Sequence, residues 1–393
     1  MFRYIGIALF LLFAVLVIVP FTLYFLGVNI FPASKVETAA PQTSNTGKAP
    51  KQLGVLIRTQ DGGATWENSA VSEDPSVTFP VTIYSFVMHP NDKDVMYVGG
   101  GASGLWKSIN GGRTWNRSVD EARALDPQAD VFDIEVTGAN GDVIYLAAFE
   151  KNRGRILRSE DAGAHFRELY ATSLEKKYVF DIVVDRTDKK HILAVTGEGA
   201  LIETKNEGLT WRIKKTFTKP LVRLIPNPNN IQELYVINGD GEVYKSVTGG
   251  SNWTEERLGV SYQGTPALEE YPPSIIKFAG GIAQGLGTVF MLDPNNASRV
   301  YLGLGKSLLR SGDGGFTWKE MNLLYSKDLL PVTAIAVDPH KSSVVYVAAS
   351  QELQKSLDDG ATWSSIALPA GVGVKKMFIH RQDSNVMFAV VGN

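Results

Sequence analysis

Seven copies of one eight-residue pattern run through this chain and constrain its fold more than any other feature. The pattern is roughly S/T-x-D/N-x-G-x-T-W, and the copies occupy residues 59–66, 108–115, 159–166, 204–211, 246–253, 311–318 and 356–363. Successive copies begin 42 to 51 residues apart, except for one gap of 65 residues after the fifth copy. A repeat of this length that is built from strand signals predicts a β-propeller, in which each repeat forms one four-stranded blade.

Each copy has the chemistry of a tight hairpin between two strands. A short polar side chain at the third position can bond nearby backbone N–H groups, and the glycine at the fifth position adopts a positive φ without steric cost. The third-position residues are Asp61, Asn110, Asp161, Asn206, Thr248, Asp313 and Asp358. The final residues, whose rings are expected to fill the apolar layer of a blade, are Trp66, Trp115, Phe166, Trp211, Trp253, Trp318 and Trp363. We interpret these copies as structural clips between third and fourth strands, not as catalytic groups.

These residues are those of the Asp-box, or bacterial neuraminidase repeat, and the chain resembles Asp-box propellers over residues 53–393. The resemblance implies an all-β, seven-bladed β-propeller. Families that share the motif include sialidases, xyloglucanase-type glycosidases, sortilin-type receptors and photosystem II assembly factors, so the motif occurs on enzymes and non-enzymes alike. The chain resembles the assembly-factor and sortilin-type branches more than the enzymes, which implies that it binds or assembles protein.

The two ends of the repeat region do not form whole blades by themselves. Only one strand, 54–59, precedes the first clip, so this end supplies a third and a fourth strand. The last clip is followed by segments 374–379 and 386–390, which have the character of a first and a second strand. Joining the two ends predicts a composite closing blade, which closes the ring and removes two open sheet edges.

Residues 1–31 differ in composition from the rest of the chain. Residues 4–28 carry no charge and are mostly apolar, and at about 1.5 Å per residue a helix of this length crosses a hydrocarbon core of about 30 Å. We predict an N-terminal transmembrane helix at 1–31, a flexible linker at 32–51 and the propeller at 52–393. Arg3 before the apolar run favours a cytoplasmic N-terminus and an extracytoplasmic propeller, as in a bacterial single-pass membrane protein. The alternative is a signal peptide that is cleaved near Ala39 or Ala40.

Charge and composition argue against several classes of function. The formal net charge is −2 and aromatic and basic residues do not interleave along the sequence, so we expect no nucleic-acid partner. The chain has no cysteine, no pair of histidines with metal-ligand spacing and no phosphate-binding glycine loop, so we expect no metal and no cofactor. Basic residues are concentrated in 151–223. They are either solvated strand faces or a sector, including Lys151, Arg153 and Arg155, that meets an acidic partner.

The gap of 65 residues places an insertion at 259–287, on the face opposite the clips. Long loops inside compact domains are usually functional or disordered. Tyr262, Glu269, Glu270 and Tyr271 in this insertion are suited to contact with a protein that carries basic groups. The alternative is that the insertion covers the central channel of the propeller.

Two first strands begin with the same four residue types, at 131–134 and 179–182, and these contain Asp133 and Asp181. A pair of carboxylates could perform acid and base chemistry on a glycoside, so the alternative function is a glycan-binding or glycoside-hydrolysing propeller. The other explanation is repeat similarity, with each aspartate bonding a neighbouring blade, and we assign no catalytic residue. Because the Arg-Ile-Pro element of sialidases is absent near the start of the propeller, we favour a membrane-anchored, extracytoplasmic scaffold that binds protein.

Overall fold

A computed structural model describes residues 55–253, 261–262, 289–303, 307–324 and 331–392. The chain divides into two units, Met1–Lys51 and Gln52–Asn393. The predicted transmembrane helix and linker lie outside the described residues. No helix among the described residues is long and apolar enough to span a membrane.

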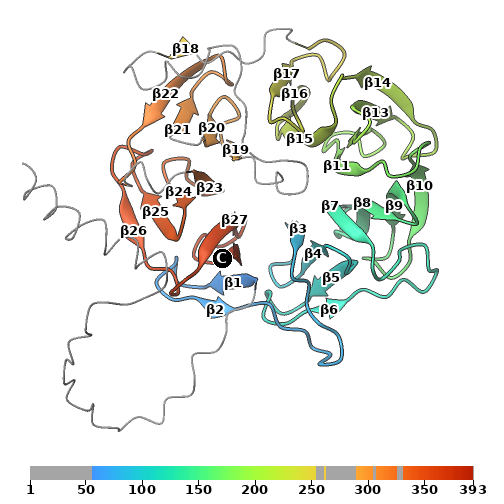
Figure 1. The fold of residues 1–393 in the computed structure, drawn as a ribbon, viewed down its shortest axis with the longest axis horizontal. Coiled ribbons are helices and arrows are strands. Elements are labelled where there is room, and N and C mark those ends of the chain that lie inside the picture. The colour runs from blue at the N-terminus through green and yellow to red at the C-terminus, as the bar shows by residue number, and fades with distance from the viewer. Residues whose placement is uncertain (1–54, 254–260, 263–288, 304–306, 325–330, 393) are drawn as a thin grey trace, which may run out of the picture. The chain divides into compact units, whose positions relative to one another are not determined.

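The described residues between 55 and 392 form an all-β, seven-bladed propeller, as the repeats predict, and its seven sheets stand in a ring (Figure 1). We number the blades in chain order of their first strands, which lie nearest the centre of the ring. Blade 1 consists of β3 (Ile83–Met88), β4 (Met96–Gly100), β5 (Leu105–Ser108) and β6 (Asn116–Arg117). Blade 2 consists of β7 (Asp130–Thr137), β8 (Val143–Glu150), β9 (Arg153–Ser159) and β10 (Arg167–Ala171). Blade 3 consists of β11 (Val179–Val184), β12 (Ile192–Thr196), β13 (Ala200–Thr204) and β14 (Arg212–Thr216).

Blades 4 to 6 continue the ring. Blade 4 consists of β15 (Leu221–Asn227), β16 (Asn230–Asn238) and β17 (Val243–Ser246). Blade 5 consists of β19 (Phe290–Leu292), β20 (Val300–Gly303), β21 (Leu308–Ser311) and β22 (Thr317–Met321). Blade 6 consists of β23 (Val332–Val337), β24 (Val345–Ala349), β25 (Glu352–Ser356) and β26 (Ser364–Ile366). The residues that follow the clip of blade 4 lie outside the described range, so its sheet has three described strands.

Blade 7 is the composite blade that the sequence predicts, and this prediction is confirmed. It consists of β27 (Gly373–Ile379), β28 (Met387–Gly392), β1 (Leu56–Thr59) and β2 (Glu67–Asn68), in the sheet order β2-β1-β28-β27. The two ends of the ring meet where β1 pairs antiparallel with β28, from Leu56 opposite Val390 to Thr59 opposite Met387. Because this pairing satisfies the backbone groups of both strands, the ring has no open edge at its seam.

The seven clips share one set of hydrogen bonds. In every clip the backbone N–H of the fifth-position glycine donates to the Ser or Thr hydroxyl at the first position, over 2.7 to 3.1 Å. Each of these glycines has a positive φ, between 72° and 97°. In the first clip Asp61 Oδ1 accepts the Thr65 N–H at 2.9 Å, and Oδ2 accepts the Thr65 hydroxyl at 2.6 Å. The hydrogen bond that the Thr59 hydroxyl donates to Oδ1 at 2.6 Å, and then the two from Thr65, hold the pKa of Asp61 well below its usual range. In this clip the Asp61 side chain therefore ties the two sides of the hairpin together.

The closing aromatic residues pack into apolar clusters, each of which lies mainly between two neighbouring blades. Trp115, Phe166 and Trp318 are buried, while Trp66, Trp211, Trp253 and Trp363 are partly exposed and pack against the rims of these clusters. The largest apolar side chains thus hold neighbouring blades together, because burial of each aromatic ring removes about 150–250 Å² from water.

Candidate functional site

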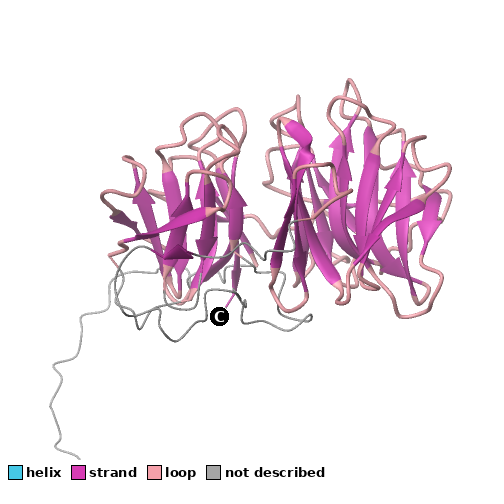
Figure 2. Cartoon of the chain, turned by 90° about the horizontal axis from the view of Figure 1, so that it is seen from above, coloured by secondary structure: helices cyan, strands magenta, loops and turns pink. Residues whose placement is uncertain are grey.

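The propeller presents two different faces, between which the strands run (Figure 2). One face carries the clips together with the turns between first and second strands, because clips donate a backbone N–H to a carbonyl of that turn, as from Gly111 to Asp94 or from Ala162 to Asp142. We call it the clip face. The opposite face, the loop face, carries the turns between second and third strands and the links from one blade to the next.

A bulge recurs at the same place in six of the first strands. The residue that follows the bulge in blades 1 to 4 and in blades 6 and 7 is Ser85, Asp133, Asp181, Arg223, Ala334 or Lys376. A β-bulge redirects the side chains next to it. Charged side chains therefore gather at one level around the central channel, at positions where the other blades have serine, alanine or valine.

These charged side chains bond neighbouring blades to one another. Asp133 Oδ2 accepts the backbone N–H of Ile182 at 3.1 Å, and Asp181 Oδ2 accepts that of Leu224 at 3.0 Å, so blade 2 is joined to blade 3 and blade 3 to blade 4. Lys376 Nζ donates to the carbonyl of Tyr84 at 2.6 Å and joins blade 7 to blade 1. Both aspartates thus make the bonds to a neighbouring blade that the repeat-similarity explanation expects.

Asp133 and Asp181 do not have the spacing of a glycosidase pair. Their carboxyl groups lie within hydrogen-bonding reach of each other, and Asp181 is only 5% exposed. Burial, and then the charge of Asp133, raises the pKa of Asp181 well above its usual value. A retaining glycosidase separates its two carboxyl groups by about 5–5.5 Å and an inverting one by about 6.5–9.5 Å, which leaves room for the sugar and water. Two carboxyl groups in direct contact leave no such room.

A row of aromatic rings lies at the loop face of blades 1 to 3. The Tyr84 and Phe132 rings stack at 4.8 Å between centroids, Phe132 meets Tyr178 edge-on at 5.7 Å, and Tyr178 stacks on Phe149 at 4.4 Å. All four residues are partly exposed. They come from the start of three first strands and the end of β8, which are the strand ends at this face.

Basic side chains border this row. Lys151 and Asn152 form the turn between β8 and β9 with positive φ values of 49° and 64°, which is uncommon for residues other than glycine. The link to blade 3 runs beside this turn, where the Lys176 N–H donates to the Asn152 carbonyl at 2.9 Å. Lys151 and Lys176 are exposed and Arg153 is partly exposed. The basic residues and the aromatic row therefore lie at the same strand ends of blades 2 and 3, although they come from separate segments of the chain.

Of the three predicted basic residues, Lys151 is exposed, Arg153 is partly exposed and donates to the Thr172 carbonyl at 3.1 Å, and Arg155 is nearly buried. Its guanidinium is 11% exposed and forms ion pairs with Glu150 and Glu168, and it donates to the Ala124 carbonyl at 3.1 Å. Arg155 is therefore engaged within the fold. Tyr262 lies in β18 (Ser261–Tyr262), which pairs in parallel with β22 at the outer edge of blade 5. Glu269, Glu270 and Tyr271 lie outside the described residues.

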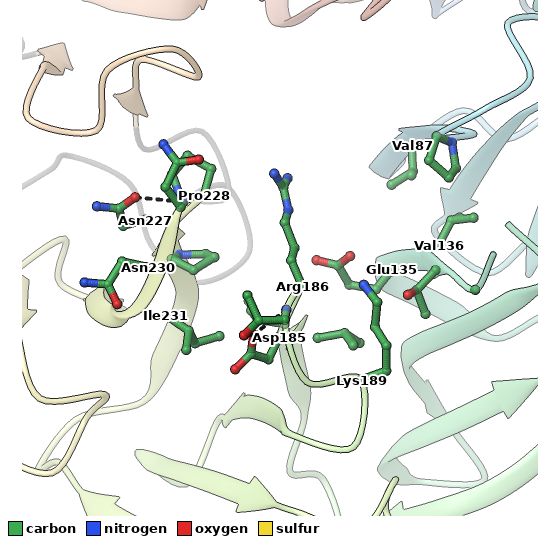
Figure 3. A pocket seen from close by; sticks show the side chains of 18 of the residues that line it. Val87, Glu135, Val136, Asp185, Arg186, Lys189, Asn227, Pro228, Asn230 and Ile231 are labelled. Atoms are coloured by element: carbon green, nitrogen blue, oxygen red, sulfur yellow. Dashed lines mark hydrogen bonds between the residues drawn. The ribbon is translucent and has the colours of Figure 1, made fainter.

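The clip-side mouth of the channel opens into a cavity of about 770 Å³ that is lined by blades 1 to 4 and by Arg381 of blade 7. Figure 3 shows Arg186 extending into this space, Glu135 pointing toward it, and Asn227 and Asn230 on the opposite wall. Lys189 and Arg381 also line the cavity. Within the part of the chain that the structure describes, no cluster of three or more His, Asp and Glu side chains is arranged to hold a metal ion.

Sequence reasoning missed Arg186, Arg381 and the aromatic row, although the repeats contain a signal for both arginines. They occupy the second residue of the turn after the first strand, where Pro90, Pro228, Pro294 and Pro339 stand in four other blades. An exposed charge where the repeat favours proline marks a departure from the structural consensus. The aromatic row has a weaker signal, because its rings come from three separate repeats.

Several solved structures share this fold. YCF48 bound to D1 peptide superposes with a TM-score of 0.58 and 13% identity over 87% of this chain and 99% of that one. YCF48 from Cyanidioschyzon merolae superposes with a TM-score of 0.58 and 14% identity over 79% of this chain and 95% of that one. The GH74 xyloglucanase from Xanthomonas campestris superposes with a TM-score of 0.54 and 17% identity over 78% of this chain but only 52% of the enzyme. At these identities the likeness is one of fold, and no family model and no curated protein sequence matches the chain.

Proposed function

We propose that the protein is a scaffold that binds another protein at the loop face of blades 1 to 3. The observation that carries this proposal is the continuous row of four partly exposed rings, Tyr84, Phe132, Tyr178 and Phe149, bordered by basic turns. We call these rings, together with Lys151, Arg153 and Lys176, the aromatic–basic surface. Aromatic and arginine side chains are enriched in the cores of protein interfaces, where rigid rings bury a large area at a small entropic cost.

The charges of this surface define the kind of partner. The link to blade 3 also carries one acid, Glu175, whose carboxylate accepts a hydrogen bond from the Asn152 amide at 2.9 Å. A partner segment that carries carboxylate side chains beside apolar ones matches this pattern, because the apolar groups cover the rings while the carboxylates meet the cations at the rim. Exposed Leu174 in the same link extends the apolar part.

The setting that we propose for this surface is the outer side of a bacterial membrane. A helix at 4–28 tethers the chain, and the linker at 32–51 gives the propeller reach toward a membrane complex. Tyr262, Glu269, Glu270 and Tyr271 in the insertion provide a second contact for the partner. The YCF48 propeller, similar in fold, was solved with a D1 peptide, which supports a peptide segment of a protein as the ligand class.

A glycan is the second candidate, because partly exposed aromatic rings also stack on sugars and the GH74 fold is similar. The chain spans about half the length of that xyloglucanase. The contact between Asp133 and Asp181 supports binding without hydrolysis in this case, since the pair lacks the spacing that glycoside cleavage needs.

Site-specific cross-linking tests the proposal. A photoactivatable side chain at position 151, in the full chain within its own membranes, should capture a defined protein band, whereas the same side chain at Lys205 on the clip face should not. Lys151→Glu combined with Lys176→Glu should weaken capture at least tenfold, about 1.4 kcal/mol, without altering the fold, because both side chains are exposed. A cross-linked product that resists protease but is digested by glycosidases identifies the glycan instead. Equal capture from positions 151 and 205 refutes this face as the interface.

A further inference from the structure

We propose that the cavity at the clip-side mouth of the channel binds a small organic anion that carries two or more carboxylate or phosphate groups. This site lies on the face opposite the aromatic–basic surface and does not depend on it. Its volume of about 770 Å³ falls within the range of about 300–1,000 Å³ that is typical of small-molecule sites. Its cationic residues are Arg186, Lys189 and Arg381.

The head groups of these three residues are available to a ligand. Among the described residues, none of the three side chains makes a hydrogen bond or an ion pair with another group of the protein, and Arg186 and Arg381 are both exposed in the cavity. An arginine side chain presents five N–H donors in a planar fork that matches carboxylate and phosphate oxygens in pairs. Two such forks from different blades, together with a lysine that lines the same cavity, favour a ligand with more than one anionic group.

The positions of the two arginines argue against an incidental surface charge. Four of the seven equivalent turn positions hold proline, which fixes φ and suits a turn. The fold itself therefore has no need of arginine there. Blades 3 and 7 both carry arginine at this position, and both side chains line the same cavity. Neutral donors and acceptors complete the lining, including Asn227, Asn230 and the buried Thr137 hydroxyl, which has no partner among the described residues.

The acidic groups of the cavity do not cancel this positive charge at neutral pH. Asp185 is 6% exposed, and its carboxylate accepts the Thr187 N–H and hydroxyl at 2.8 Å and lies 3.1 Å from the His191 ring nitrogen, so it is occupied within its own turn. Glu135 faces the cations. Burial, and then the charge of Asp133, raises the pKa of Glu135 to about 8 although Arg186, Arg381 and Lys189 oppose the shift. At pH 7 the Glu135 carboxyl is therefore mostly neutral and can donate a hydrogen bond to an anion.

Calorimetric titration of the full chain in mild detergent at pH 7 and low ionic strength tests this site, with citrate and inorganic pyrophosphate as probes and glucose as the neutral control. We expect saturable binding of at least one anion below about 1 mM and none of glucose. Arg186→Gln combined with Arg381→Gln should weaken that binding at least tenfold, because glutamine keeps the chain length and removes the charge. Lys151→Gln combined with Lys176→Gln, on the loop face, should leave it unchanged.

The pH dependence gives an independent readout. Ionisation of Glu135 above pH 8 places a negative charge among the cations, so affinity should fall between pH 7 and pH 9, and Glu135→Gln should flatten that fall. The proposal is overturned if neither anion binds up to about 10 mM, roughly ten times the expected limit. It is equally overturned if the double arginine variant binds as tightly as the unmodified protein. Loss of protein capture by the loop-face variant with intact anion binding, or the reverse, separates this site from the proposed function.

Discussion

Replacement of Asp181 by asparagine should change how the stability of the propeller depends on pH. The Asp181 carboxyl is buried between blades, contacts the Asp133 carboxyl and accepts the Leu224 N–H at 3.0 Å. Asparagine has the same shape, so its carbonyl can accept that N–H while its NH₂ group donates to Asp133. The substitution also removes the ion pair between Asp181 Oδ2 and Arg223 Nε, which lie 3.2 Å apart. This costs little stability, because the arginine side chain is 41% exposed.

The magnitude follows from proton linkage. The pKa of Asp181 is raised in the folded protein, so the native state holds a proton over a pH range in which the unfolded chain, with its ordinary value of 3.8, has lost it. Within that range the folded state binds one more proton than the unfolded state, and its stability falls by about 1.4 kcal/mol for each unit of rising pH. This contribution is complete below the unfolded pKa and is lost as the pH rises through the folded one. Asparagine does not titrate, so Asp181→Asn should lack this slope.

Urea unfolding at pH 5, 6 and 7 measures the difference. The free energy of unfolding should fall more steeply with pH in the unmodified protein than in Asp181→Asn, so the variant should gain relative stability at each step. Asp188→Asn is the matched control, since Asp188 lies in the same blade, is exposed and, among the described residues, accepts a hydrogen bond to its carboxylate from the Lys190 N–H alone, at 3.1 Å. Parallel pH profiles for the unmodified protein and Asp181→Asn would refute the buried shared proton.

Two further changes test the architecture. Deletion of 373–393 removes β27 and β28 and exposes the edge of β1, so the ring should lose cooperative unfolding and aggregate; a monomer with an unchanged melting temperature in a thermal scan would contradict closure by blade 7. Trp318→Ala empties a buried site between blades 4 and 5 and should cost about 3–5 kcal/mol in urea unfolding, while cross-linking from position 151 in the surviving folded protein stays the same. A loss of cross-linking without a loss of stability would indicate that the interface lies on the clip face and not on the loop face.

The sequence predicts the frame of this fold because its signals are local. The clip glycines, the apolar first strands and the two half-blades each act over a few residues, so their pattern determines hairpins and the order of strands. The length of an edge strand is less local, because it depends on pairing with one neighbour only, and the fourth strand of blade 1 comprises only Asn116–Arg117. The aromatic row is harder to predict, because its rings come from different repeats and meet only in the folded propeller. Phe132 and Tyr178 are 46 residues apart in the chain yet touch, and no local period specifies which aromatic rings on successive blades will meet.

The origin of the candidate sites explains why they were only partly predicted. Asp133 and Asp181 stood out as a repeated pair, but only the three-dimensional arrangement shows that they contact each other and hold the next blade. Lys151 and Arg153 were identified by charge alone, whereas Arg155 in the same segment turns inward to Glu150. Alternation along the strand does not separate them, because residues two apart face the same side of a sheet. Arg155 differs because the carboxylates of Glu150 and Glu168 lie beside its guanidinium.

The seam between β1 and β28 also has a consequence for synthesis. Of the described strands, residues 56–59 leave the ribosome first, but they cannot pair with their partner strand until 387–392 have emerged, more than 320 residues later. At about 5–20 residues per second, an exposed edge therefore persists for many seconds on every nascent chain. Blades 1 to 6 can assemble in order during that interval, whereas the ring closes only after nearly all of the propeller has been translated. A chain whose synthesis stalls within blade 7 keeps an unpaired edge on β1, which can pair with other chains. Chaperones and proteases can therefore distinguish incomplete copies from complete ones before these reach a partner.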